Sequence, residues 1–314
     1  MALVTTPLAV TGGEHTAQQL RMMLRDLAQT NQGVTAGTHL KATALSTPGG
    51  AVQISDGSAT INGKASPTQG SYNAYNIGSH QVPITATGGT PRSDMVILRV
   101  QDPEHEGSRD PSDCVFFDVV SNVSSSATTV PSGYSAIPIC RVDIPASTGT
   151  ITNAMIKDLR QVTNPRRVRI QDPYYAADPY VFINGTSETW KTFPNLVMKQ
   201  IAIPAWAAKM QVAFTISGLR LATGNVWGNF RFMLGTIEAA QYVGIDDNQG
   251  AAARRNTVQM IETIDLTTTA GAAIRGTTQP FYSRMRTRSS NAGDIGVDAT
   301  TTFNIDYEFL EGPL

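Results

Sequence analysis

Apolar and polar residues alternate through much of the chain with a period of two, which is the period of strands that bury one face. Residues 302–310 show the pattern most clearly, because every second side chain is large and apolar. These apolar residues are Phe303, Ile305, Tyr307 and Phe309. Similar strand-like segments occur at 199–204, 210–217, 229–234 and 256–266. Their length and spacing predict an antiparallel, jelly-roll-like β-sandwich in the C-terminal part of the chain.

The first half is also patterned as β-structure. Residues 95–100 and 115–120 are apolar runs, which predict buried central strands. The Asp-Gly pair at 56–57 predicts a two-residue turn between two alternating segments, and Pro138 predicts an edge or a bulge in its strand. A Ser/Thr-rich segment at 121–133 has the composition of a loop. The fold class is therefore mainly β.

One N-terminal segment has the period of an amphipathic helix. Its apolar stripe consists of Leu20, Met23, Leu24 and Leu27. The opposite side carries Arg21, Arg25 and Asp26. Thr16 and Gln19 have the spacing of a capping box, which places the start of the helix, and Gly33 is predicted to end it. The stripe is expected to pack on its own domain, and the alternative is packing against other copies or a neighbouring protein.

Pattern and composition together predict two domains. Residues 1–164 form the helix and a β-rich domain, and residues 181–314 form the sandwich. Between them, residues 165–180 contain three prolines and a short basic run, and are predicted to be a linker whose arginines make inter-domain or inter-subunit contacts.

The charge balance argues against several classes of partner. Only 16% of the 314 residues are charged, and the net charge is −1. Without a block of like charge, no nucleic-acid partner is expected, and without a long apolar run or a signal sequence, no membrane insertion is expected. The protein is expected to be soluble and made in the cytoplasm, with Cys114 and Cys140 as buried free thiols.

Motifs for catalysis or for cofactor binding are not recognisable in the sequence. The four histidines are scattered, and the acidic turns at 102–107 and 246–250 lack the full ligand pattern of a calcium loop, so both are interpreted as solvated turns. No cofactor, no metal and no enzymatic activity are expected. Two carboxylates at the separation needed for glycoside hydrolysis remain an alternative.

The best binding candidates lie at 281–288. One face of this predicted strand carries Tyr282, Arg284, Arg286 and Arg288. Phe281 and Met285 lie on the other face. An aromatic ring beside a row of guanidiniums suits an anionic cell-wall glycan, and the alternative is a solvated or inter-subunit face. The three tryptophans could be sugar platforms, but are interpreted as core residues. They are Trp190, Trp206 and Trp227.

Several motifs of the first half follow one another in a familiar order. From Gly33 the chain runs GVTAGTHLKAT, PGGAVQISDGSATINGK and QGSYNAYN, then PRSD at 91–94 with RVQD at 99–102, and finally KDLR at 157–160. This order resembles the N-terminal domain of minor tail proteins of actinobacteriophages, over residues 1–162. The Ser/Thr-rich loop and Cys140 depart from that family's pattern.

The resemblance implies a tail-tip or baseplate component of a phage virion, assembled in the host cytoplasm. Other tail proteins would be its partners, and a homotrimer is expected. The first domain would anchor the chain, and the sandwich would be a receptor-binding module or a spacer. A cell-wall polysaccharide depolymerase and a capsid decoration protein are the alternatives. Four charged residues of the resembling motifs are interpreted as structural latches: Arg92, Asp94, Asp158 and Arg160.

Overall fold

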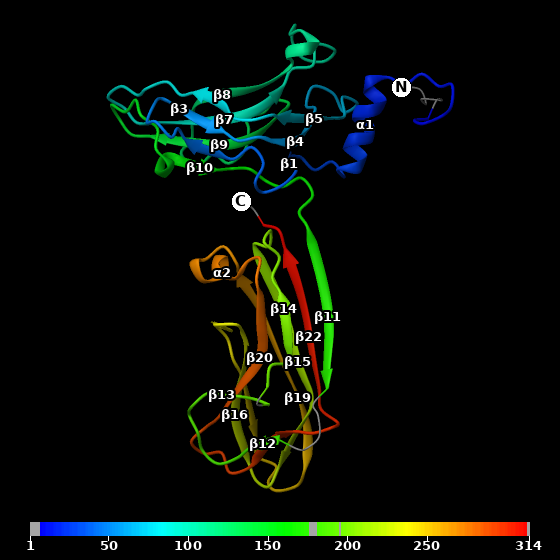
Figure 1. Cartoon of the computed structure of the whole chain (residues 1–314), viewed down its shortest axis with the longest axis vertical. Coiled ribbons are helices and arrows are strands. Elements are labelled where there is room, and N and C mark those ends of the chain that lie inside the picture. Colours follow the sequence, from blue (N-terminus) through cyan, green and yellow to red (C-terminus); the bar gives the residue numbers. More distant parts are fainter. Residues whose placement is uncertain (1–6, 176–180, 195, 313–314) are drawn as a thin grey trace. The chain divides into compact units, whose positions relative to one another are not determined.

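A computed structural model describes residues 7–175, 181–194 and 196–312. It is mainly β, with one helix near the N-terminus and several antiparallel sheets, so the predicted fold class is confirmed. The chain divides into two compact units (Figure 1), one ending at Pro165 and the other spanning Arg166–Gly312. No helix among the described residues is long and apolar enough to cross a membrane.

The first unit contains α1 (Ala17–Leu27) and ten strands in three sheets. One sheet has the order β1 (Gly33–Val34), β4 (Gly57–Asn62), β5 (Ser71–Asn76). A second has the order β2 (Ala42–Ala44), β3 (Ala51–Ile54), β6 (His80–Pro83). The third has the order β10 (Ile156–Asp158), β9 (Ala136–Ile144), β7 (Arg92–Val100), β8 (Val115–Val123). Two 3-10 turns, Pro111–Asp113 and Asn153–Met155, complete the unit. Apolar side chains from all three sheets share one core.

Two local predictions in this unit need correction, and a third holds for one of its two alternatives. The chain passes from one sheet to another at the Asp-Gly pair at 56–57, because β3 and β4 pair with different strands and form no hairpin. Strand β7 is buried and central as predicted, but β8 is an edge strand with no buried residue. Pro138 lies beside a register shift between Val96 and Ile97, as predicted for a bulge, although its strand β9 is internal and not an edge.

The unit closes where its last residues meet its first strand. The N–H of Val34 donates to the carbonyl of Gln161 at 2.8 Å, and the N–H of Thr163 donates to the carbonyl of Val34 at 2.9 Å. The Thr163 hydroxyl donates to the carbonyl of Gly33 at 2.7 Å. Gly33 has a φ of +144°, and a Cβ atom there would lie 2.1 Å from the Gln161 carbonyl oxygen. Only glycine allows this approach.

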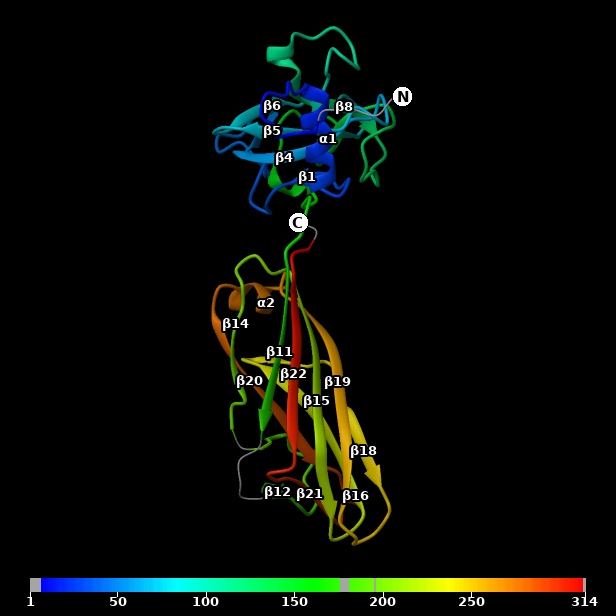
Figure 2. The same cartoon turned by 90° about the vertical axis from the view of Figure 1, so that its right-hand side faces the viewer.

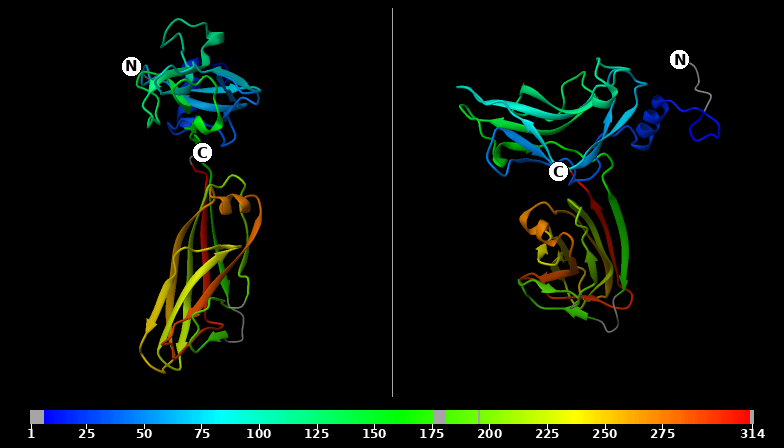
Figure 3. Two further views of the ribbon diagram at one scale, coloured as in Figure 1. Left: turned by 90° about the vertical axis from the view of Figure 1, so that its left-hand side faces the viewer. Right: turned by 45° about the horizontal axis from the view of Figure 1, so that its top comes forward.

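The second unit is an antiparallel β-sandwich. One sheet has the order β11 (Arg167–Tyr175), β22 (Thr302–Leu310), β15 (Lys209–Ala222), β21 (Asp294–Val297), β12 (Val181–Ile183), and β19 (Arg254–Asp265) also pairs with β15. The other has the order β13 (Lys191–Thr192), β20 (Thr278–Thr287), β16 (Val226–Leu234), β17 (Ile237–Glu238), with β14 (Lys199–Ala202) on β20 and β18 (Val243–Asp247) on β16. The short helix α2 (Thr269–Ile274) precedes β20. Figures 2 and 3 show the two sheets from the side.

The core of the sandwich follows the alternation seen in the sequence. In β22 every second residue is buried, and the buried set is the predicted Phe303, Ile305, Tyr307 and Phe309. Phe214 of β15 stacks on Phe303 at 6.2 Å within its own sheet and meets Phe281 of the facing sheet edge-on at 5.3 Å. The aromatic rings therefore join the two layers.

The predicted linker at 165–180 is wrong for most of its length. Residues 167–175 form β11, which pairs with all of β22, while 176–180 lie outside the described residues. Its arginines pair with acids of the C-terminal strand and its end, within the second unit. The pairs are Arg166–Glu311, Arg167–Glu308 and Arg169–Asp306. The sequence pattern did not identify this strand, because both of its faces are largely exposed and neither carries a row of buried apolar residues.

Replacement of Gly33 tests the closure of the first unit. We expect Gly33→Ala to lower the free energy of unfolding by about 2–4 kcal/mol, because the methyl group meets the Gln161 carbonyl and the backbone conformation is strained. Gly107→Ala is the matched control, because Gly107 also has a positive φ but open space around its Cβ position. It should cost about 1 kcal/mol. Equal losses in denaturant titrations would contradict the closure.

Candidate functional site

Helix α1 begins as predicted and ends earlier. Thr16 is the N-cap, its hydroxyl accepts from the Gln19 N–H at 3.2 Å, and the Gln19 side chain accepts from the Thr16 N–H at 2.9 Å. The helix ends at Leu27 with Ala28 as its C-cap, so Gly33 belongs to β1 and does not end the helix. The capping box fixed the start because it is a local interaction.

The burial of α1 differs from the expectation on both sides of the helix. Leu20, Met23 and Leu27 are exposed, at 48%, 39% and 69%, and Leu24 is half-buried. Arg21, on the charged side, is buried at 8% exposure. The expectation that the apolar stripe packs on its own domain is therefore wrong for most of the stripe.

Arg21 is held by a polar pocket of the first unit. Its Nε donates to the carbonyl of Gln69 at 2.8 Å, and its terminal nitrogens contact Asp102 at 3.2 Å and Glu104 at 2.8 Å. The guanidinium also lies 5.6 Å from the ring centroid of Tyr72. The helix approaches β5 so closely that a Cβ at Gly70 would lie 2.6 Å from the Arg21 backbone. We call these contacts the Arg21 latch.

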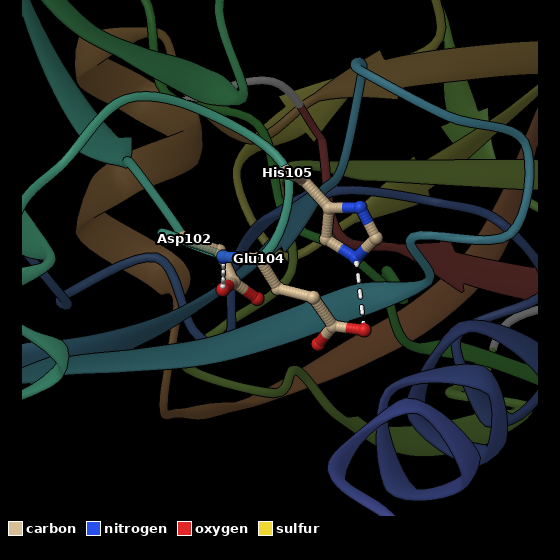
Figure 4. A group of neighbouring side chains, drawn as sticks. All are labelled: Asp102, Glu104 and His105. Carbon is tan, nitrogen blue, oxygen red and sulfur yellow. Dashed lines mark hydrogen bonds and ion pairs between the residues drawn. The ribbon is translucent and has the colours of Figure 1, made fainter.

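The acidic turn at 102–107 supplies most of this pocket. Figure 4 shows Asp102, Glu104 and His105 turned toward one another, with potential ligand atoms that all lie within 4.8 Å. These residue types can hold a metal ion, but the Arg21 guanidinium contacts two of them, and its NH2 lies 3.1 Å from Nε2 of His105. A buried, permanently charged arginine already occupies the cation position. The cluster is therefore the counter-ion of Arg21.

Titration of the pocket follows from its hydrogen bonds. Burial raises the pKa of the Asp102 carboxyl, but hydrogen bonds from the Tyr72 hydroxyl and the Glu104 N–H, together with the charge of Arg21, outweigh burial and hold the pKa below 3.8. Burial and the neighbouring Asp102 carboxylate raise the pKa of the Tyr72 hydroxyl, which donates to Asp102 at 2.7 Å. Asp102 is thus ionised and paired near neutral pH.

The four residues interpreted as latches form two ion pairs in the first unit. Arg92 binds Asp94 through two nitrogens, with Nε–Oδ1 and NH2–Oδ2 distances of 2.8 Å, and the buried Asp94 also accepts from the Asn122 N–H. Arg160 binds Asp158 at 2.6 Å and donates to the carbonyl of Gly37. The first pair ties β7 to Asn122 of the neighbouring strand β8, and the second ties the segment after β10 to the loop at Gly37, so both contacts are structural.

The binding candidates of β20 lie on one face, as their alternation predicted. Phe281, Ser283, Met285 and Thr287 are buried, whereas Tyr282, Arg284, Arg286 and Arg288 are half-buried on the opposite side. On the neighbouring strand β16, Arg231 stands directly beside Arg284. This outward side of the sheet gathers both arginines and aromatic rings.

Two of the three tryptophans lie outside the core, contrary to the expectation. The Trp190 ring lies 4.2 Å from the Arg231 guanidinium and 4.8 Å from that of Arg286. Trp227 lies 5.2 Å from the Arg288 guanidinium. Trp206 does pack against the core. We call the outward side of β16 and β20 the arginine–tryptophan face; it consists of Trp190, Trp227, Arg231, Tyr242, Arg284, Arg286 and Arg288.

Sequence reasoning missed part of both sites. Trp190 and Tyr242 precede short edge strands, where no periodic pattern marks them, and only the strand order brings them beside β20. The sequence did contain a signal for Arg21. An arginine in the capped helix and the acidic turn at 102–107 are of opposite charge, and could have been predicted to form an ion pair. The thiols are both free as expected, although Cys114 is only half-buried.

Comparisons with known proteins do not assign the chain. No family model matches it. No curated protein matches it either. Among solved structures, infectious bursal disease virus, Gx strain, has 11% identity over 93% of this chain and 87% of that chain, with a TM-score of 0.23. A mutant VP2 protein of the same virus has 10% identity over 93% and 79%, with a TM-score of 0.25. A Bacillus thuringiensis Cry1Da tryptic core variant has 11% identity over 96% and 56%, with a TM-score of 0.15. Likenesses this weak carry no argument about fold or function.

Removal of the Arg21 charge tests the latch. We expect Arg21→Gln to lower the free energy of unfolding by about 3 kcal/mol near pH 7, because it leaves the Asp102 carboxylate buried without its cation. The pKa of Asp102 is lower in the folded state than its ordinary value of 3.8. Its pairing therefore contributes to the free energy of unfolding above pH 3.8, and the contribution is lost as the pH falls through the folded-state pKa. The difference between wild type and variant should therefore shrink in acid.

Arg25→Gln is the control on the same helix. Arg25 donates to the Pro67 carbonyl at 2.8 Å, and its ion pair with the exposed Asp26 is 3.8 Å long, so its loss leaves no largely buried carboxylate unpaired and should cost about 1 kcal/mol at every pH. Denaturant unfolding of the three proteins across the acid range measures both effects. A pH-independent cost for Arg21→Gln would show that Asp102 is not its partner.

Proposed function

We propose that this chain is a structural protein of a phage virion, a minor tail or baseplate component that attaches through α1 and its domain. The observation that carries the proposal is the orientation of α1. Its apolar stripe is exposed while the Arg21 latch binds the opposite side to the domain. An apolar row that remains exposed to this extent on the isolated chain is suited to contact with another subunit.

The latch explains why the stripe stays exposed in the free chain. Rotating α1 to bury Leu20 and Leu27 would break the ion pairs of Arg21 with Asp102 and Glu104 and leave the largely buried Asp102 carboxylate without a cation. Rotation of the helix about its axis therefore cannot bury the apolar stripe and keep the ion pairs of Arg21 at the same time. A neighbouring subunit can cover the stripe without disturbing the latch.

The resemblance of residues 1–162 to actinobacteriophage minor tail proteins supports the tail or baseplate, and a homotrimer, as the finer assignment. Both of the resembling motifs PRSD and RVQD supply residues to ion pairs of the first unit. PRSD supplies the Arg92–Asp94 pair, and RVQD supplies Asp102 of the latch. The sandwich would then be the part that faces outward, as host-surface module or spacer.

A structural, non-enzymatic role is part of the proposal. Three carboxylates of the two acidic turns are paired with arginines: Asp102 and Glu104 with Arg21, and Asp247 of the turn at 246–250 with Arg254 at 2.5 Å. Such pairing suits stability better than proton transfer. Release of reducing ends from purified host envelopes by the pure protein would contradict this part.

Charges placed on the stripe test the attachment. Virions made with a Leu20→Glu/Leu27→Glu double variant should lack the protein, because two carboxylates cannot be buried in an apolar contact. The isolated variant should keep its stability within about 0.5 kcal/mol, because both positions are exposed and glutamate favours helix. Protein content of purified particles, and its presence in tail or head fractions, is the measurement.

Ile77→Glu is the matched control. Ile77 is 86% exposed in the same unit, at the end of β5 away from the residues that meet the latch. We expect normal incorporation of this variant. Normal incorporation of the double variant would contradict the proposed attachment, and recovery of the wild type only with heads would favour a capsid decoration protein.

A further inference from the structure

The four guanidiniums of the arginine–tryptophan face are not equivalent. Arg231 and Arg284 both contact one oxygen of Glu238, at 2.8 and 2.7 Å. Arg288 lies 3.4 Å from Glu188. These three arginines therefore have carboxylate partners within the chain.

Arg286 is the exception. Its Nε donates to the side-chain oxygen of Asn229 at 3.1 Å, and no carboxylate lies within ion-pair distance of it among the residues that the structure describes. A guanidinium has five N–H donors in a planar fork, so the terminal nitrogens of Arg286 are left for a group outside the chain. The group that matches such a fork is a phosphate or a carboxylate.

Two aromatic rings flank this guanidinium from different sides. Trp190 precedes β13, which pairs with β20, and lies 4.8 Å from the Arg286 guanidinium. Tyr242 precedes β18, which pairs with β16, and lies 5.3 Å from it. The rings meet edge-on at 6.0 Å, and a hydrogen bond from Arg284 to the Trp190 carbonyl at 3.1 Å holds the indole in place. The cation is thus oriented before any ligand arrives, which lowers the entropic cost of binding.

A hollow of about 210 Å³ lies on the same sheet beside Trp227. It is lined by Asn225, Val226, Trp227, Asp246, Asn248 and Ser290. An indole surrounded by amide, hydroxyl and carboxylate groups suits a sugar ring, which has an apolar face and a rim of hydroxyls. Arg288, whose guanidinium lies 5.2 Å from the Trp227 ring, is two residues after Arg286 in the chain, so the hollow and Arg286 belong to neighbouring parts of the same face.

We propose that the arginine–tryptophan face binds an acidic polysaccharide. Arg286 would hold a phosphate or carboxylate group of the polymer, and the hollow at Trp227 would hold a neighbouring sugar ring. The binding site stands on the geometry of the second unit alone, and its role in contact with a host surface rests on the proposed function. The spacing of charge favours this class over a polynucleotide, because one open cation matches sparse anions and not a phosphate every few ångströms.

The test uses the full-length protein and polymers of defined chemistry. A polysaccharide whose sugar repeats are joined by phosphodiesters carries phosphate, hyaluronate carries carboxylate, and dextran carries no charge. We expect binding to one or both acidic polymers and none to dextran. Arg286→Gln should weaken that binding by about tenfold and reduce its salt dependence by about one charge.

Arg275→Gln is the matched control, because it removes the same charge at the exposed C-cap of α2, outside the face. It should leave binding unchanged. Tyr242→Leu removes a ring that is 54% exposed and should weaken binding without changing the melting temperature. Equal weakening by Arg275→Gln, or equal binding of dextran, would overturn the proposal. Tighter binding of oligo(dT), lost in Arg286→Gln, would reassign the face to single-stranded nucleic acid.

Polymer binding and incorporation into virions are measured separately, so loss of the binding site can be told from loss of the assembly role. Particles carrying Arg286→Gln should contain normal amounts of the protein, because the variant leaves α1 and the latch intact. A chain that binds acidic polysaccharide but is absent from virions would keep the site and lose the assembly role. A chain that is incorporated normally but binds none of the polymers would keep the assembly role and lose the site.

Discussion

The guanidinium of Arg21 lies between α1 and the acidic turn at 102–107, in contact with Asp102, Glu104 and the Gln69 carbonyl. Separating a buried carboxylate from its cation costs several kcal/mol, more than exposing two leucines that remain partly in water. The ion pairs therefore decide which side of the helix faces the domain. The exposed apolar stripe, and with it the proposed attachment to a virion, follows from that decision.

The same principle separates structural from binding arginines throughout the chain. Arg92, Arg160 and the arginines of β11 end on carboxylates of their own unit, and these contacts tie strands together. Arg286 ends on an amide and two aromatic rings, and no described residue pairs with its terminal donors. A planar cation that is oriented but not neutralised is the feature that a ligand with a matching anion can use.

Much of the fold could be predicted, because alternation is a local property of a strand with one buried face. It placed the core residues of β22 and the outward row of β20, and the capping box, also a local signal, placed the start of α1. It failed where a strand has no buried face: β8 was taken for a central strand because it is rich in apolar residues, and β11 for a linker because its residues are charged or polar. Both strands are held by backbone pairing with a neighbour, β8 with β7 and β11 with β22.

The sequence by itself determined the β-class, the helix and the sidedness of its strands, since each depends on residues a few positions apart. Only the tertiary structure decided which face of α1 is covered, because Arg21 and Asp102 lie 81 positions apart in the chain and are joined by the approach of β5 to the helix. The strand order likewise brought Trp190 and Tyr242 to Arg286, from segments that pair with different strands. Periodicity reports the environment of one segment, whereas a site depends on which segments meet.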